Sequence, residues 1–297
     1  MGATIPASGV SVPEGTTPAL TSPASHIQVF RLARYQLRDY LLSRRFILML
    51  GIVAVLGVIL TSVIGYYRPA SLLGTSDNFY NQIWAGAVTV VIVFAGVIFG
   101  GDAIAGEFQN KTGYFLMGLP VKRATVYSGK YVAAFVSSFV ALVAFAAILL
   151  GNAAFYFGTG AFTVAFLESF LLAVVYLLAL LGATFLFSSM FKTSTYAVLV
   201  VAVMFIFGFS IVQALVAGLI KIEPWFIISY ASPVIGYPFD ATIPAHMVTV
   251  TSMGPRGHTT SFTSYNPTYA EGVVIMLGYF LVTAILGLLL FEREEFT

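Results

Sequence analysis

The sequence predicts an all-α membrane protein in which six transmembrane helices follow an amphipathic helix at the membrane surface. Of the 297 residues, 59% are hydrophobic and only 9% are charged, whereas a soluble domain carries about a quarter charged residues. Six apolar runs each reach the roughly 20 residues that a helix needs to cross a bilayer. Because unpaired backbone groups are costly in lipid and these runs lack the alternation of strands, helices are the expected structure.

Residues 1–24 form a polar N-terminal segment that is rich in Pro, Ser, Thr, Gly and Ala and contains no Lys or Arg. A secretory signal needs a basic region followed by an apolar one, and this segment has neither. We predict that it is a disordered tail.

Residues 25–45 are predicted to form a cytoplasmic interfacial helix. Ser25 and Gln28 have the spacing of a capping box. Arginines beside an apolar face suit the anionic cytoplasmic leaflet, because their stems can cover apolar surface. A plain solvated helix next to the membrane is the alternative. The two faces are formed by Phe30, Ala33, Leu37 and Leu41 and by Arg31, Arg34, Arg38 and Arg45.

Residues 46–297 are predicted to form the six-span transmembrane domain. Only one of the runs contains a charged residue, Glu168. An intramembrane acid is a candidate for a substrate or proton path, because a charge in the bilayer is costly. Glu168 is nevertheless only about 7 residues, roughly 10 Å, from the outer end of its run, where it can also snorkel or stay protonated. The predicted spans are Phe46–Tyr67, Ile83–Gly101, Tyr131–Phe157, Ala161–Phe191, Thr195–Ile220 and Gly272–Phe291.

The basic residues predict that both termini are cytoplasmic. With the N-terminus inside, eleven of the 14 Lys and Arg residues lie in cytoplasmic segments and three lie outside. This distribution follows the positive-inside rule, to which acidic residues contribute little. The outer three are Arg68, Lys221 and Arg256.

The segment 221–271 is predicted to be a long extracytoplasmic connection. Its roughly 50 residues exceed an ordinary loop, which suggests structure or function of its own. The aromatic stretch Pro224–Pro233 is predicted to lie at the outer interface or to dip into the membrane. Residues Thr249–Tyr269, rich in Gly, Ser, Thr and Pro, are predicted to be a mobile loop.

Several kinds of site are not expected. The chain has no cysteine, which excludes disulfides and thiolate chemistry. The formal net charge of +2 gives no reason to expect nucleic-acid binding. Ser128–Tyr131 partly matches a phosphate-binding loop, but it lacks the Gly and the Ser or Thr that such a loop requires. We find no catalytic motif. No metal site is predicted, because the three histidines are far apart and lack ligand spacing; they are His26, His246 and His258.

The connection Gly101–Lys130 gathers charged residues between two uncharged runs. Glu107 and Lys111 are spaced for a surface ion pair on a helix that continues the second span. Tyr114–Met117 then places four large apolar residues outside the bilayer, where a protein partner or the membrane interface must cover them. The residues alone leave these two possibilities equal. The charged residues are Asp102, Glu107, Lys111, Lys122, Arg123 and Lys130.

This connection resembles the coupling segment of the permease subunit of type 2 ABC transporters. The order of elements over about residues 26–297 agrees, including Ser232-Pro233 between spans five and six. The patterns that carry the resemblance are Asp102-x-x-x-Gly106-Glu107, Asn110-Lys111-Thr112, Leu116-x-x-Leu119-Pro120-Val121-x-Arg123 and Gly129-Lys130.

The resemblance implies that residues 102–123 dock on a separate cytoplasmic ABC ATPase, which binds ATP and Mg²⁺, so that this chain needs no cofactor and is not itself an enzyme. Gly113-Tyr114-Phe115 departs from the Leu-rich turn more usual in the family. Carried over by position, the ATPase-coupling residues are Glu107, Lys111, Thr112, Gly113, Tyr114, Phe115, Pro120 and Arg123.

The predicted function is therefore that of a plasma-membrane permease subunit that pairs with a second permease copy and with ABC ATPases. Export is the favoured direction on the resemblance, and the apolar spans suit a hydrophobic or lipid-like substrate. Two alternatives stay open. One is an ion- or proton-coupled secondary transporter with Glu168 as its acid, although the broken helices or repeats of such proteins are not evident. The other is a non-transporting membrane anchor of a partner complex.

Overall fold

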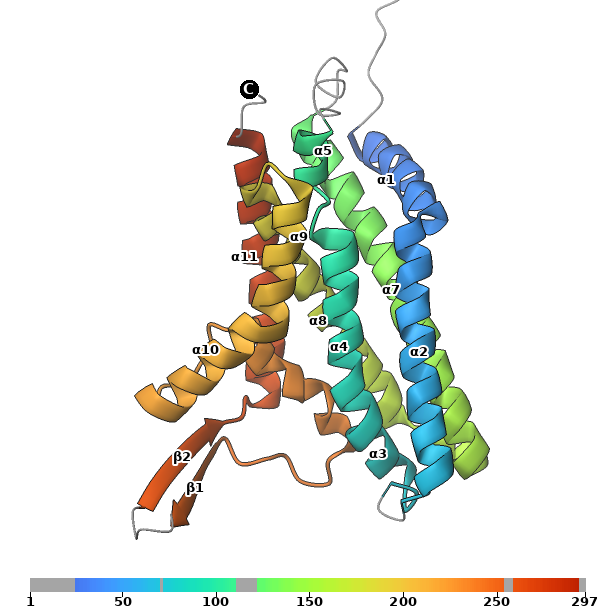
Figure 1. The fold of residues 1–297 in the computed structure, drawn as a ribbon, viewed down its shortest axis with the longest axis vertical. Coiled ribbons are helices and arrows are strands. Elements are labelled where there is room, and N and C mark those ends of the chain that lie inside the picture. The colour runs from blue at the N-terminus through green and yellow to red at the C-terminus, as the bar shows by residue number, and fades with distance from the viewer. Residues whose placement is uncertain (1–24, 70–71, 111–121, 254–258, 294–297) are drawn as a thin grey trace, which may run out of the picture.

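A computed structural model describes residues 25–69, 72–110, 122–253 and 259–293 (Figure 1). The predicted tail, residues 1–24, lies outside the described residues. Most of the predicted coupling segment, residues 111–121, does so too. The remainder is an elongated bundle of long helices with a small β-hairpin at one end.

The prediction of six spans is confirmed, since six long helical runs are apolar enough to cross a membrane. Four π-helical turns interrupt the second and fifth runs without breaking them. Span one is α2 (Arg44–Tyr67), and span two consists of α3 (Ser76–Phe79), η1 (Tyr80–Trp84), α4 (Ala85–Ala95), η2 (Gly96–Gly100) and α5 (Ala105–Gln109). Spans three and four are α7 (Arg123–Phe157), extended by η3 (Gly158–Ala161), and α8 (Val164–Met190). Span five is α9 (Ser194–Val203), η4 (Met204–Gly208), α10 (Phe209–Leu215) and η5 (Val216–Ile220), and span six is α11 (Tyr269–Arg293).

Helix α1 (Ser25–Leu42) precedes the first span and packs along α7. Its buried face contains Ala33 and Tyr40, whereas Phe30, which we assigned to the apolar face, is 70% exposed. The close approach to α7 requires Gly129, because a Cβ there would clash with the side chain of Leu32. Ser43 separates α1 from α2, with its hydroxyl accepting from Phe46 N at 3.3 Å as an N-cap.

Helix α8 is the most buried span and lies at the centre of the bundle against α11, α7 and α4. Gly96 and Gly100 of span two face it so closely that a Cβ at either position would clash with Leu180 or Thr184. This Gly-x-x-x-Gly pair therefore serves packing within the chain.

Two ends of the bundle can be distinguished in Figure 1. The α1 end carries α1, α5 and the last turn of α11, and the hairpin end carries β1 (Met247–Met253) and β2 (Thr259–Tyr265). The run α9–α10 leans away from the other helices toward the hairpin end. Only 11% of its most apolar window is buried within the chain, so it presents a wide apolar surface.

The long connection at the hairpin end is structured over most of its described length. Two short 3₁₀ segments, η6 (Ile228–Ile235) and η7 (Tyr237–Phe239), bury several side chains against α8 and α11. The segment Pro224–Pro233, which we predicted to lie at the outer interface or to dip into the membrane, contains both exposed and buried side chains. Trp225 is 61% exposed, whereas Tyr230 is fully buried.

The prediction of a loop over Thr249–Tyr269 is wrong for most of the described residues. Strands β1 and β2 pair antiparallel, with Met247 opposite Tyr265 and Met253 opposite Thr259. The alternating β-branched residues of Met247–Met253 favour a strand, and the Ser and Thr content had suggested a loop. Residues 254–258, which join the strands, lie outside the described part.

Candidate functional site

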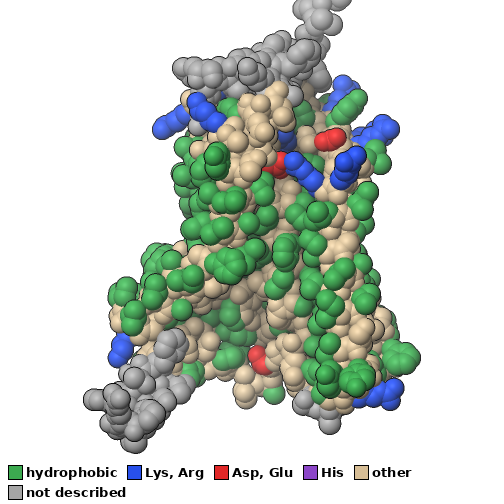
Figure 2. Space-filling model, in the orientation of Figure 1, with side chains coloured by type: hydrophobic (Ala, Val, Ile, Leu, Met, Phe, Trp, Pro, Cys, Tyr) green, Lys and Arg blue, Asp and Glu red, His purple; other side chains and the backbone are tan. Residues whose placement is uncertain are grey.

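The strongest concentration of paired charges lies at the α1 end, around the place where α5 leads toward residue 111. Figure 2 shows Lys and Arg side chains gathered at this end of the visible face, next to a wide hydrophobic band. Four elements contribute to the site: the start of α2, the turn and helix at 101–109, the first turns of α7 and the start of α9.

A turn separates η2 from α5 within the second span. Residues 101–104 leave the helical path, and α5 begins again at Ala105. The freed backbone donors Ile104 N and Ala105 N both bond to the hydroxyl of Ser188 on α8, at 3.0 and 3.1 Å. A side chain of another helix thus satisfies donors that a helix start leaves open.

Asp102 connects this turn to two other spans. Its carboxylate lies 2.5 Å from Nη1 of Arg45 at the start of α2. The same carboxylate oxygen accepts from the hydroxyl of Ser194 at the start of α9, at 3.1 Å. Asp102 is buried and Arg45 is half exposed. The chain therefore compensates a buried charge with a cation and a hydroxyl from separate helices.

Lys130 forms the second ionic contact of the site. Its ammonium group pairs with Glu107 of α5 and donates to the carbonyl oxygen of Ala103 at 2.9 Å. The side chains are only 7% and 15% exposed for Lys130 and Glu107. A buried ammonium is tolerated when it is paired and hydrogen-bonded in this way.

A polar pocket of about 210 Å³ lies between α1 and this turn. Asp39, Tyr40, Arg45, Asp102 and Lys130 are among its lining residues. Burial, followed by the nearby Asp102 carboxylate, raises the pKa of the Tyr40 hydroxyl above its usual value. Tyr40 is therefore a neutral phenol at physiological pH, and its hydroxyl faces the carbonyl oxygen of Phe99 at 3.5 Å.

Arg123 holds the beginning of α7 against the end of α11. Its Nη1 donates to the carbonyl oxygens of Glu292 at 2.7 Å and Phe291 at 3.4 Å. These carbonyls belong to the last turn of α11, where a helix leaves acceptors unsatisfied. The described contacts of Arg123 thus join the return from the coupling segment to the last span.

The structure brings together some of the predicted site residues and not others. Glu107 belongs to the site, where it pairs with Lys130, and its predicted partner Lys111 lies outside the described residues. Glu168 lies apart, exposed in the second turn of α8 toward the hairpin end. The predicted coupling residues Lys111, Thr112, Gly113, Tyr114, Phe115 and Pro120 lie outside the described residues.

Sequence reasoning missed the roles of Arg45, Ser188, Lys130 and Ser194. Lys130 was predicted only as one of the charged residues and as part of the Gly129-Lys130 pattern, with no contact assigned to it. Ser188 and Ser194 carry no such signal, because their partners are 84 and 92 residues away in the sequence.

The fold and this site define a multi-span membrane protein with a cluster of paired charges at one end of its helix bundle. Residues 31–296 match the profile of the family described as ABC-2 family transporter protein, and the chain belongs to that family. It is therefore an ABC transporter permease, a multi-pass component of the membrane, which in bacteria is the plasma membrane. Members of this family associate with an ABC ATPase subunit. No individually curated relative matches the chain.

Proposed function

We propose that this chain is the membrane subunit of an ATP-driven exporter, in which two permease copies pair with two cytoplasmic ABC ATPases. The ATPases bind ATP and Mg²⁺ and move the segment 102–123. The permease converts this movement into rearrangement of its spans, because ATP binds the two conformations with different affinities.

The observation that carries this proposal is the ionic network at the root of the segment. Glu107 precedes residues 111–121 and Lys130 follows them, and their ion pair fixes the two sides to each other. Asp102 adds contacts to the starts of α2 and α9. A force applied to the segment is therefore transmitted to four spans at once.

The distribution of charges supports the proposed orientation. Among the described residues, ten Lys and Arg lie at the α1 end and two lie at the hairpin end. Under the positive-inside rule the α1 end faces the cytoplasm, where the ATPases are. The two at the hairpin end are Arg68 and Lys221.

Co-purification with a co-expressed ABC ATPase tests the docking. We expect Glu107→Ala, which releases the root, and Tyr114→Ala, which removes a predicted contact, each to reduce retained ATPase at least fivefold. Arg34→Ala, which removes an exposed cation from α1 at the same end, serves as the matched control and should retain the wild-type amount. If both test variants hold the ATPase as tightly as wild type, the docking assignment is wrong.

A further inference from the structure

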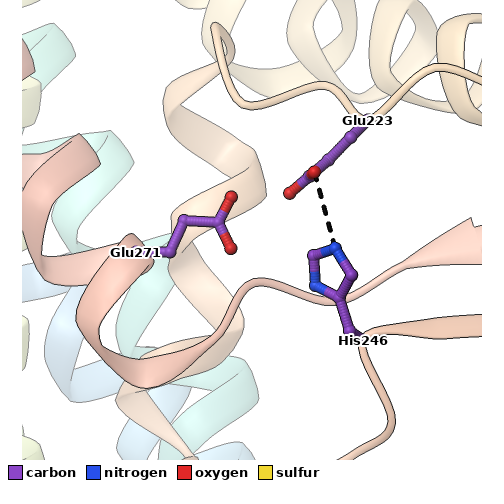
Figure 3. Close-up of side chains that lie close together, drawn as sticks. All are labelled: Glu223, His246 and Glu271. Carbon is purple, nitrogen blue, oxygen red and sulfur yellow. Dashed lines mark ion pairs between the residues drawn. The ribbon is translucent and has the colours of Figure 1, made fainter.

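Three potential metal ligands meet at the hairpin end, far from the charged site described above. Glu223 follows η5, His246 precedes β1, and Glu271 lies in the first turn of α11 (Figure 3). One ligand atom from each residue lies within 4.8 Å of the other two. The three residues are up to 48 positions apart in the sequence, so only the fold brings them together.

A backbone carbonyl fixes the orientation of the His246 ring. Nδ1 of His246 lies 2.9 Å from the carbonyl oxygen of Asn266. A carbonyl can only accept, so Nδ1 carries the hydrogen and Nε2 is the free nitrogen of a neutral ring. Nε2 then lies 3.5 Å from Glu223 Oε2. A backbone carbonyl that fixes the tautomer in this way is the usual support of a metal-binding histidine.

Both carboxylates are also held by groups outside the cluster. The hydroxyl of Tyr230 donates to Glu223 Oε1 at 2.6 Å. The backbone N–H of Thr268 donates to Glu271 Oε2 at 3.1 Å. The supporting donors occupy one oxygen of each carboxylate, so the remaining oxygens are available to a ligand.

The converging atoms are all electron-pair donors. A neutral imidazole nitrogen and two ionised carboxylates repel one another unless a proton or a cation lies between them. A single proton, such as the one in the hydrogen bond from Glu271 to Glu223, offsets one negative charge, and a divalent cation offsets two. Nitrogen combined with carboxylate oxygen is a ligand set that suits Zn²⁺ and related transition metals.

The geometry is compatible with such an ion. Ligand bonds to Zn²⁺ of about 2.0–2.2 Å place neighbouring ligand atoms roughly 3–3.5 Å apart. The ligand atoms, which lie within 4.8 Å of one another, would have to approach by about one or two ångströms at most. His246 is exposed and both glutamates are partly exposed, so solvent can deliver the ion and complete its coordination.

We propose that Glu223, His246 and Glu271 bind one divalent transition-metal cation of the Zn²⁺ class, which clamps the root of the β-hairpin to the ends of spans five and six. The bound ion would reinforce contacts between these segments such as the hydrogen bond from Tyr265 Oη to the Lys221 carbonyl, at 2.8 Å. The site is independent of the ATPase-coupling function proposed above.

Isothermal titration of Zn²⁺ into the full-length protein tests this site. The protein is purified in detergent through a histidine-free tag and stripped with a chelator. We expect wild type to bind one equivalent, and His246→Ala and Glu271→Gln each to weaken binding at least tenfold. The double variant His26→Ala/His258→Ala, which leaves His246 as the sole histidine of the chain, should bind as wild type does.

A second control removes an exposed carboxylate from the other end of the same helix. Glu292→Gln should leave Zn²⁺ binding unchanged, and circular dichroism shows whether each variant retains its helix content. The proposal is overturned if folded His246→Ala binds Zn²⁺ as tightly as wild type. It is also overturned if wild type binds no Zn²⁺.

Discussion

Lys130 and Glu107 form an ion pair across the two sides of the segment 111–121, with both side chains almost completely buried. Removing one partner of such a pair deprives the other of its opposite charge, which costs about 3 kcal/mol. We therefore expect Lys130→Met to lower the free energy of unfolding by about that amount. The double variant Lys130→Met/Glu107→Gln should lose less, because the charge of Glu107 is then removed as well. Chemical denaturation in detergent measures both, and equal losses in the single and double variants would contradict the pairing.

The contact between α1 and α7 gives a second prediction. A Cβ at Gly129 would lie 2.5 Å from Leu32 Cδ2 and 3.2 Å from Leu32 Cβ, so in Gly129→Ala the Leu32 side chain or α1 itself must shift, at a cost of about 1–3 kcal/mol. Gly151 lies on the same helix with open space around its Cα, and Gly151→Ala should be neutral or stabilising by up to about 1 kcal/mol. Gly129→Ala should therefore lower the thermal midpoint, whereas Gly151→Ala should leave it unchanged or raise it. Equal midpoints would show that α1 is not packed closely on α7.

The six spans were predictable because the membrane imposes length and apolarity on every crossing helix. Their long-range pairing was not, since it depends on contacts such as Ser188 with Ile104, which nothing in the local sequence indicates. The charged turn itself was visible as an island of polarity. The pair predicted between Glu107 and Lys111 lies partly outside the described residues, and the ion pair of Glu107 with the distant Lys130 comes from folding and has no local signal.

The hairpin end shows a different limit of sequence reasoning. Composition indicated a loop over 249–269, whereas cross-strand pairing stabilises Ser- and Thr-rich strands that have weak signals alone. Glu223, His246 and Glu271 lacked metal-ligand spacing, because their proximity comes from the packing of η6 against α8 and α11. Residues brought together only by tertiary structure leave no periodic pattern.

A substitution at Glu168 can distinguish ATP-driven transport from proton-coupled transport. Its side chain is exposed near the hairpin end of α8 and belongs to no described ion pair. We expect Glu168→Gln to change the ATPase rate of the reconstituted complex less than twofold, with or without an imposed pH gradient. A wild-type rate that depends on the gradient, together with loss of that dependence in the variant, would favour a proton-coupled mechanism.

The ionised carboxyl of Glu223 is expected to stabilise the hairpin end, so this end should lose stability in acid. Partial burial alone would raise the pKa of its carboxyl, but hydrogen bonds from Glu271 and Tyr230 and the nearby His246 outweigh burial and lower the pKa below its usual value of 4.5. A carboxyl with a lowered pKa stabilises the fold when ionised, so its contribution is present above about pH 4.5 and is lost as the pH falls through the lowered pKa.

Metal-free wild type should therefore be more stable than Glu223→Gln at pH 7, and this difference should shrink toward pH 4. Thermal unfolding in a chelating buffer measures the difference at each pH. Glu292→Gln, an exposed acid at the other end of the bundle, should show no comparable pH-dependent difference. A difference between wild type and Glu223→Gln that stays constant from pH 7 to pH 4 would contradict the assignment.

The orientation can be tested directly because the natural chain contains no cysteine, so a single introduced thiol reports without background. Arg34→Cys places it on the exposed face of α1, and Ile243→Cys places it at a site 59% exposed near the hairpin. With the α1 end inside, a membrane-impermeant maleimide should label Ile243→Cys on intact cells and Arg34→Cys only after the cells are opened. The reverse pattern would place the charged site outside, where no cytoplasmic ATPase can reach it.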